Sequence, residues 1–194
     1  MKKQLARFLV LALLPLGIFS CKKDYDGLGP LQDSVTDIPI TVPNQEFFER
    51  FPIVTASVSK KDAATGATGP FTIVLQIPAD KGKIKEITKI TTGTAGLNNL
   101  QGADALALNY DAATSRVVPI PGNGTNEITF TSNLDQYTAY RTRVGAGSAG
   151  QPATVSPNSS FTPQNPNQLP YYFLVTLEDG QQLVSTAIRV RIVN

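Results

Sequence analysis

The stretch that decides the fold is the carboxyl-terminal run YYFLVTLEDGQQLVSTAIRVRIV, residues 171–193. It holds two segments rich in apolar, β-branched and aromatic residues, joined by the turn residues 178–180. Asp-Gly supplies the positive φ angles of a tight primed turn, so the two segments are predicted to pair as an antiparallel hairpin. Apolar residues in 188–192 alternate with Arg189 and Arg191, which predicts one buried face and outward arginines.

Further strands are predicted upstream of this hairpin. The clearest two-residue period covers residues 71–77, and Phe47, Phe48 and Phe51 are expected to plug one end of the core. Weaker strand patterns occupy residues 38–42, 53–59, 84–91, 106–110, 117–120 and 128–131. About eight or nine short strands with frequent Gly and Pro predict an all-β fold, an antiparallel β-sandwich of the immunoglobulin-like kind.

Residues 132–144 (SNLDQYTAYRTRV) support two predictions. Leu134, Thr138, Tyr140 and Val144 match the spacing of the stretch that forms the tyrosine corner in fibronectin type III domains, which this segment therefore resembles. The same segment suits one short helix near 133–144, capped by Ser132 or Asn133 and ended by Gly145, with arginines in its last turn. The helix is favoured, because Gln136 stands where the fibronectin stretch has proline.

A long loop, residues 145–169, is rich in Gly, Ser, Pro, Asn and Gln. Loops of this length inside a domain are usually functional or disordered. The sequence therefore predicts a β-sandwich domain over residues 35–194 that contains this loop.

Residues 1–20 form a secretory leader. Lys2, Lys3 and Arg7 make a positive start, and residues 8–19 (FLVLALLPLGIF) are almost entirely apolar. A membrane-spanning helix needs about 20 apolar residues, so this shorter run is expected to be a signal peptide that is removed.

Residues 18–21 (Ile-Phe-Ser-Cys) resemble a lipobox. The resemblance implies a diacylglycerol thioether on Cys21, cleavage between Ser20 and Cys21, and an added acyl chain such as palmitate on the new amine. Two or three chains anchor a protein stably, whereas one is marginal. An ordinary signal peptide with a chance cysteine is the alternative, but Cys21 is the only cysteine in the chain.

Residues 21–34 are expected to be the acylated cysteine and a flexible tether. Lys22-Lys23-Asp24-Tyr25-Asp26 resembles the lysine-and-acid signals that favour surface display of Bacteroidetes lipoproteins, and Ser34 matches their O-glycosylation acceptor. This implies a lipid-anchored protein of the outer membrane at the cell surface, with the periplasmic face as the alternative.

Composition excludes several functions. Without Lys2, Lys3 and Arg7, the 17 basic residues fall to 14 against 15 acidic ones, a net charge of −1, so no nucleic-acid partner is expected. The basic residues between Lys81 and Lys89 are expected on a solvated face. The chain has no histidine and its one thiol is expected to carry lipid, so we expect no catalytic residues, cofactor or metal site. Asp104, Asp111, Glu127 and Asp135 are expected to be turn residues rather than a hydrolase pair.

Weak candidates for ligand contact are Tyr137, Tyr140, Tyr171 and Tyr172, because saccharide sites favour flat aromatic side chains. Half-buried tyrosines of the sandwich explain the same pattern. Overall, the chain resembles the small, single-domain, immunoglobulin-like lipoproteins of the Bacteroidetes, mostly without assigned function. The resemblance implies a non-catalytic binding or accessory module whose partner is an outer-membrane protein or a polysaccharide. The alternatives are a purely structural or assembly component of the outer membrane, a glycan-binding surface protein and, least favoured, a carboxylate-based hydrolase.

Overall fold

A computed structural model describes residues 38–93, 95–145 and 167–194. The predictions for the signal peptide, Cys21, the tether and Ser34, and for most of the loop 145–169, therefore lie outside the described residues. The described residues form one compact unit.

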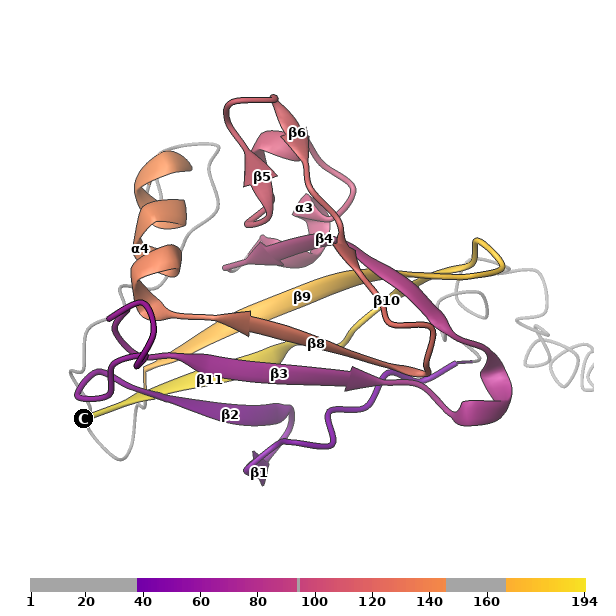
Figure 1. The fold of residues 1–194 in the computed structure, drawn as a ribbon, viewed down its shortest axis with the longest axis horizontal. Coiled ribbons are helices and arrows are strands. Elements are labelled where there is room, and N and C mark those ends of the chain that lie inside the picture. Colours follow the sequence, from indigo (N-terminus) through magenta and orange to yellow (C-terminus); the bar gives the residue numbers. More distant parts are fainter. Residues whose placement is uncertain (1–37, 94, 146–166) are drawn as a thin grey trace, which may run out of the picture. The chain divides into compact units, whose positions relative to one another are not determined.

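The strands of the described residues form two β-sheets and a small hairpin (Figure 1). Strand order in the large sheet is β1 (Phe47–Phe48), β2 (Pro52–Ser57), β11 (Ile188–Val193), β9 (Gln168–Leu177), β4 (Ile84–Thr92) and β7 (Ile120–Pro121), and β10 (Gln182–Val184) also pairs with β9. The small sheet consists of β3 (Phe71–Gln76) and β8 (Glu127–Ser132), and the hairpin consists of β5 (Tyr110–Asp111) and β6 (Arg116–Val117). The helical elements are η3 (Ala79–Lys81), α3 (Gly96–Asn99), η4 (Asp104–Leu106) and α4 (Leu134–Arg143). The fold is mainly β, as predicted.

One strand pair departs from the predicted antiparallel arrangement. β2 and β11 run parallel, with Ile53 opposite Arg189 and Ser57 opposite Val193, whereas the other described strand pairs are antiparallel. Parallel strands need a long connection, and residues 58–187 of the chain lie between these two strands. The turn signals along the chain describe only neighbouring strands, so they could not predict this pairing.

The small sheet packs against the large one through aromatic rings. Phe71 of β3 and Phe130 of β8 lie with ring centroids 5.6 and 6.1 Å from Tyr171, and Phe130 lies 5.4 Å from Phe173. Alternate residues of β3 are buried, as its two-residue period predicts, and alternate residues of β9 are buried as far as Val175. These strands share one hydrophobic core.

The carboxyl-terminal hairpin is confirmed, but its turn differs from the prediction. Gly180 has φ 89°, and Asp179 is not among the non-glycine residues with positive φ. The amide of Gly180 donates to the carbonyl of Leu177, and the amide of Leu177 donates to the carbonyl of Gln181, at 3.0 and 2.9 Å. A three-residue loop with glycine in the left-handed conformation replaces the primed turn.

The predicted helix near 133–144 is confirmed as α4, and no tyrosine corner forms. Asn133 caps it, because its side-chain oxygen accepts from the amide of Gln136 at 2.8 Å. Gly145, at φ 88°, follows the last turn. The inward face carries Leu134, Tyr137, Tyr140 and Val144.

Two other expectations are wrong. Phe47 and Phe48 are 48% and 66% exposed rather than plugging the core, because β1 is a two-residue strand at the edge of the large sheet. Lys89 is only 6% exposed, because its ammonium donates to the carbonyl of Gly102 at 2.8 Å and pairs with Asp104 at 3.1 Å.

Candidate binding site

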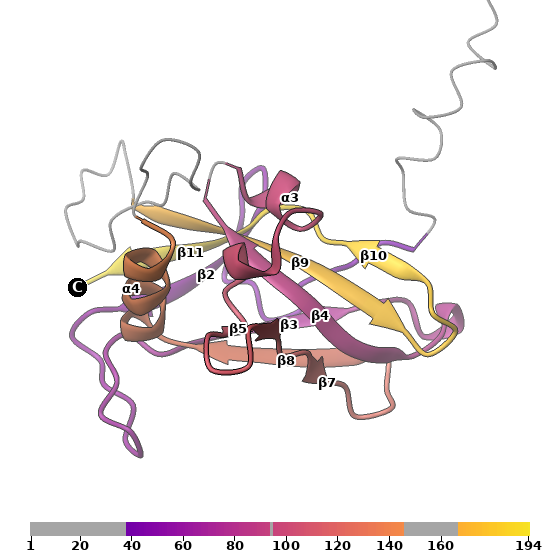
Figure 2. The ribbon, with the colours of Figure 1, turned by 90° about the horizontal axis from the view of Figure 1, so that it is seen from above.

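An excursion of the chain, residues 93–119, leaves the large sheet after β4 and returns at β7 (Figure 2). Asn109 fastens it to β4. Its side-chain oxygen accepts from the amide of Ile90 at 3.0 Å, and its amide group donates to the carbonyls of Thr88 and Val118 at 3.2 and 2.9 Å. Because one side chain satisfies three backbone groups of two separate segments, the excursion is held in one position.

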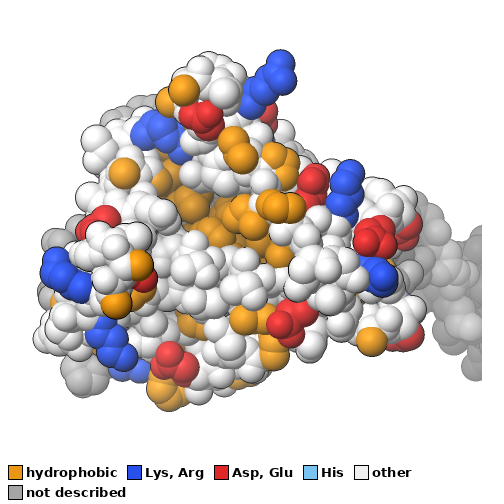
Figure 3. All heavy atoms as spheres, in the orientation of Figure 1, with side chains coloured by type: hydrophobic (Ala, Val, Ile, Leu, Met, Phe, Trp, Pro, Cys, Tyr) orange, Lys and Arg blue, Asp and Glu red, His pale blue; other side chains and the backbone are white. Residues whose placement is uncertain are grey.

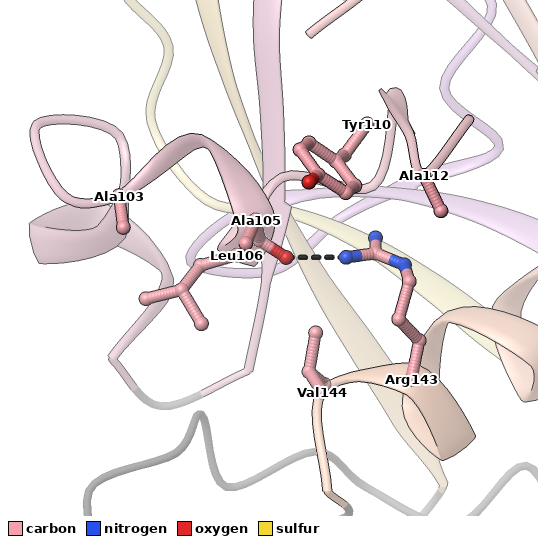
Figure 4. Close-up of a pocket in the computed structure, with 7 residues that line it drawn as sticks. All are labelled: Ala103, Ala105, Leu106, Tyr110, Ala112, Arg143 and Val144. Carbon is pink, nitrogen blue, oxygen red and sulfur yellow. Dashed lines mark hydrogen bonds between the residues drawn. The ribbon is translucent and has the colours of Figure 1, made fainter. Parts of the chain in front are cut away.

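Two side chains of α4 hold the excursion from the other side. The hydroxyl of Tyr140 donates to the carbonyl of Leu106 at 3.2 Å. The guanidinium of Arg143 donates to the carbonyl of Ala105 (Figure 4) and to that of Ala107. Its central carbon also lies 5.1 Å from the ring centroid of Tyr110 and 5.4 Å from that of Tyr140, within the range of cation–π attraction. Arg143 therefore bridges the helix and the excursion.

This bridge lies beside two surface hollows of about 480 and 500 Å³. Figure 3 shows apolar side chains gathered in a depression in the middle of the visible face. Tyr110 and Arg143 line both hollows. The smaller is also lined by Ala103, Ala105, Leu106, Ala112 and Val144. The larger is also lined by Leu108, Asn109, Ile120, Phe130, Thr131, Gln136, Ala139 and Tyr140.

The larger hollow lies between two strand edges. Phe130 and Thr131 belong to β8, and Ile120 belongs to β7. Within the described ranges, β8 pairs only with β3, and β7 pairs only with β4. Each strand thus has one edge without a strand partner, and the hollow lies beside both strands.

The electrostatics of the hollows are set by one cation. Arg143 lines both, and neither is lined by an aspartate or a glutamate. Burial raises the pKa of the Tyr140 hydroxyl above its ordinary value, while contacts with Thr92 and the charge of Arg143 act in the opposite direction. The hollows therefore offer an apolar floor, hydroxyl and amide groups, and a positive charge, but no nucleophile with an adjacent base.

The tyrosines predicted as ligand contacts lie in different places. Tyr137 and Tyr171 have no exposed surface, so in this structure they are core residues and not a platform. Tyr140 is buried but reaches the larger hollow. Tyr172 is half-buried, and its ring lies where a side chain on Gly96 of α3 would stand. Aromatic rings on the inward side of β9 and α4 add to the core, which is why the sequence pattern could not separate them from a binding surface.

Each candidate carboxylate has its own local partner. Asp104 pairs with Lys89, Asp111 accepts from Thr114, Glu127 accepts from Gln76, and Asp135 accepts from the amide of Thr68. Turn hydrogen bonds lower the pKa of the exposed Asp111, the amide of Ala113 contributing most. Among the described residues no group of three or more metal-binding side chains occurs.

Sequence reasoning missed Arg143, Tyr110 and Asn109. From the sequence alone, the arginines at the end of the helix are explained by the helix dipole, and Tyr110 by a strand that leads into a turn. Their roles depend on contacts between segments that are far apart in the sequence, 36 residues from Arg143 to Ala107 and 21 from Asn109 to Thr88. No local signal reports such contacts.

No family model, no curated protein and no solved structure matches this chain. In the part of the chain described here, no helix has the length and apolar character needed to cross a bilayer.

Proposed function

We propose that this protein is a lipid-anchored, non-catalytic binding module of the bacterial outer membrane, displayed at the cell surface, that binds an extended polypeptide segment of a partner protein. The segment lies in the larger hollow, between β7 and β8. The observation that carries this proposal is that β7 and β8, each with one edge that no described strand pairs with, line the same hollow.

Backbone chemistry supports a polypeptide as the ligand. The outer edge of a strand presents N–H and C=O groups that an extended peptide can pair with. Thr129 and Thr131 of β8 have exposed side chains, so one face of this strand is in contact with solvent and carries small polar groups. A peptide that adds to such an edge gains affinity from main-chain hydrogen bonds and specificity from alternate side chains.

The hollow then selects side chains. Its floor includes Leu108, Ile120 and Phe130, and burying one aliphatic or aromatic side chain there is worth about 1.5–3 kcal/mol. Arg143 at the rim favours an acidic neighbour in the peptide, because no carboxylate of the site competes for its charge.

The proposed location in the outer membrane is supported by the sequence. Ile18-Phe19-Ser20-Cys21 follows an apolar run too short to span a bilayer, and the lone cysteine stands where lipid would be attached. We also include an immunoglobulin-like sandwich in the proposal. The aromatic contacts between the β3–β8 pair and β9 support it.

The test uses peptides that are selected from a random peptide library for binding to the full mature protein. Ala139 is exposed and lines the larger hollow, so Ala139→Trp is expected to weaken the selected peptides at least about tenfold by filling the space that one side chain occupies. Ala63 is exposed in a turn far along the chain, and Ala63→Trp is the matched control with unchanged affinity.

Amide hydrogen exchange, measured with and without peptide, tests directly whether the peptide pairs with the edge of β8. Bound peptide is expected to slow exchange of amides in β8, at residues 127–132. Peptides that bind equally well to Ala139→Trp, or that leave β8 exchange unchanged, would contradict the site. Binding of glycans but of no peptide would contradict the ligand class.

A further inference from the structure

A cluster of phenylalanine and arginine side chains lies at the β1 edge of the large sheet, away from the hollows. We call it the Phe–Arg patch, and it consists of Phe47, Phe48, Arg50, Phe51, Arg189 and Arg191. Phe48 is 66% exposed and is the most exposed of the large hydrophobic residues in the described ranges. Such adjacent exposed rings are costly in water unless they serve an interface.

The arginines of the patch stack on its rings. The guanidinium of Arg189 lies 4.6 Å, and that of Arg50 5.6 Å, from the ring centroid of Phe51. The guanidinium of Arg191 lies 5.8 Å from the ring of Phe47. Stacking uses the face of a guanidinium, so the edge nitrogens that stay accessible can donate hydrogen bonds to an anion.

These cations have no carboxylate partner among the described residues, whereas Lys89 has one in Asp104. The Nε of Arg191 is buried without a hydrogen-bond partner. One nitrogen of Arg189 donates to Gln168 at 2.7 Å, which orients its guanidinium without neutralising it. The patch therefore combines exposed apolar rings with three arginines that form no ion pair among the described residues, while two exposed carboxylates, Glu46 and Glu49, lie in the same stretch of chain.

The length of the chain between Cys21 and the domain limits which surfaces the Phe–Arg patch can contact. Sixteen residues, 22–37, join Cys21 to the domain, and even fully extended they reach at most about 55 Å. A lipid on Cys21 would thus hold the domain at high local concentration beside a bilayer, so even a weak affinity for the lipid surface would orient it. Basic groups attract anionic lipids, and phenyl rings insert at the boundary between headgroups and acyl chains.

We propose that the Phe–Arg patch rests on the surface of an anionic membrane, with Phe47 and Phe48 inserted and the arginines bound to lipid phosphate. This inference rests on the lipid anchor of the proposed function. In Figure 1, β1 lies at the lower margin of the domain and the β5–β6 hairpin at the upper margin. Contact through the patch would therefore turn the hollows away from the membrane and toward a partner.

The chain contains no tryptophan, so the fluorescence of a single introduced tryptophan depends only on the surroundings of that residue. The full lipidated protein carrying Phe48→Trp is reconstituted into vesicles of phosphatidylcholine and phosphatidylglycerol with brominated acyl chains. Bromine is expected to quench the reporter at least about twofold, because an inserted ring lies within roughly 5–10 Å of the acyl boundary. Leu97→Trp is the matched control, since Leu97 is 52% exposed on α3 and is expected to stay unquenched.

Arginine substitutions test the electrostatic part. These variants are made in the unlipidated mature chain that carries Cys21→Ala. Arg50→Gln and Arg191→Gln are each expected to lower its affinity for the same vesicles about fivefold. Added salt is expected to weaken the binding of the parent chain. Lys61→Gln, in an exposed turn, is the control with at most a small loss.

The outcomes separate the two proposals. A natural protein without lipid, which does not stay with vesicles, would overturn the anchor. An anchored protein in which Phe48→Trp and Leu97→Trp are quenched equally would overturn the patch alone, as would equal losses for the arginine and Lys61 variants.

Discussion

At the scale of single residues, Tyr171 shows how the core tolerates a polar atom. Its ring has no exposed surface and contacts Phe71, Phe130, Phe173 and Tyr137. Its hydroxyl has no hydrogen-bond partner among the described residues. Burial raises the pKa of this hydroxyl well above 10, and the neighbouring Tyr137 and Tyr140 raise it further.

Tyr171→Phe is expected to stabilise the protein by about 1 kcal/mol at neutral pH, because it removes an unsatisfied buried hydroxyl and keeps the ring. The raised pKa also sets a pH dependence. Below pH 10 the hydroxyl is neutral in both states. Above pH 10 the unfolded chain loses this proton while the folded chain keeps it, so stability falls as pH rises.

Urea unfolding at neutral pH and above pH 10 measures both effects. The fall in stability at high pH is expected to be smaller in Tyr171→Phe than in the wild type. Tyr172→Phe, at a half-buried position on the same strand, is the control and keeps the wild-type dependence. A Tyr171→Phe variant less stable than the wild type at neutral pH would contradict the account.

At the scale of elements, α4 begins where one side chain caps it. Asn133→Ala removes the acceptor for the amide of Gln136 and is expected to cost about 1 kcal/mol of unfolding free energy. Asn133→Ser keeps an acceptor and is expected to restore most of that loss. Asn98→Ala, on the exposed side of α3, is the control. Equal stabilities for Asn133→Ala and Asn133→Ser would show that the cap contributes nothing.

The sequence predicts a helix or strand correctly where the residues that determine it are close together in the chain. The cap at Asn133, the glycine after α4 and the alternation in β3 each involve residues within a few positions, and the structure confirms them. The exposed β1 and the buried Lys89 depend on which distant segments cover them, and there the predictions failed. The same limit hid Arg143, whose partners lie on the excursion.

At the scale of the whole molecule, the proposed anchor gives the sharpest expectation. Cys21→Ser is expected to leave an unprocessed precursor, heavier by the leader and lacking labelled palmitate, because no thioether can form. Gel mobility and palmitate labelling of membrane fractions measure this. Ser34→Ala is the matched control: it keeps processing, and it lowers the apparent mass only if the tether is glycosylated. Normal cleavage of Cys21→Ser would contradict the lipoprotein assignment.

The sequence by itself determined what neighbouring residues encode: a mainly β chain, the carboxyl-terminal hairpin, the helix at 134–143, and a proposed lipid address at Cys21. Only the tertiary structure decided the parallel pairing of β2 with β11, the hollow between β7 and β8, and the exposure of the Phe–Arg patch. The physical reason is the distance along the chain over which the interactions act. Capping, turn chemistry and alternation act over two to four residues, whereas strand order, cavities and patches depend on which distant surfaces exclude water from one another.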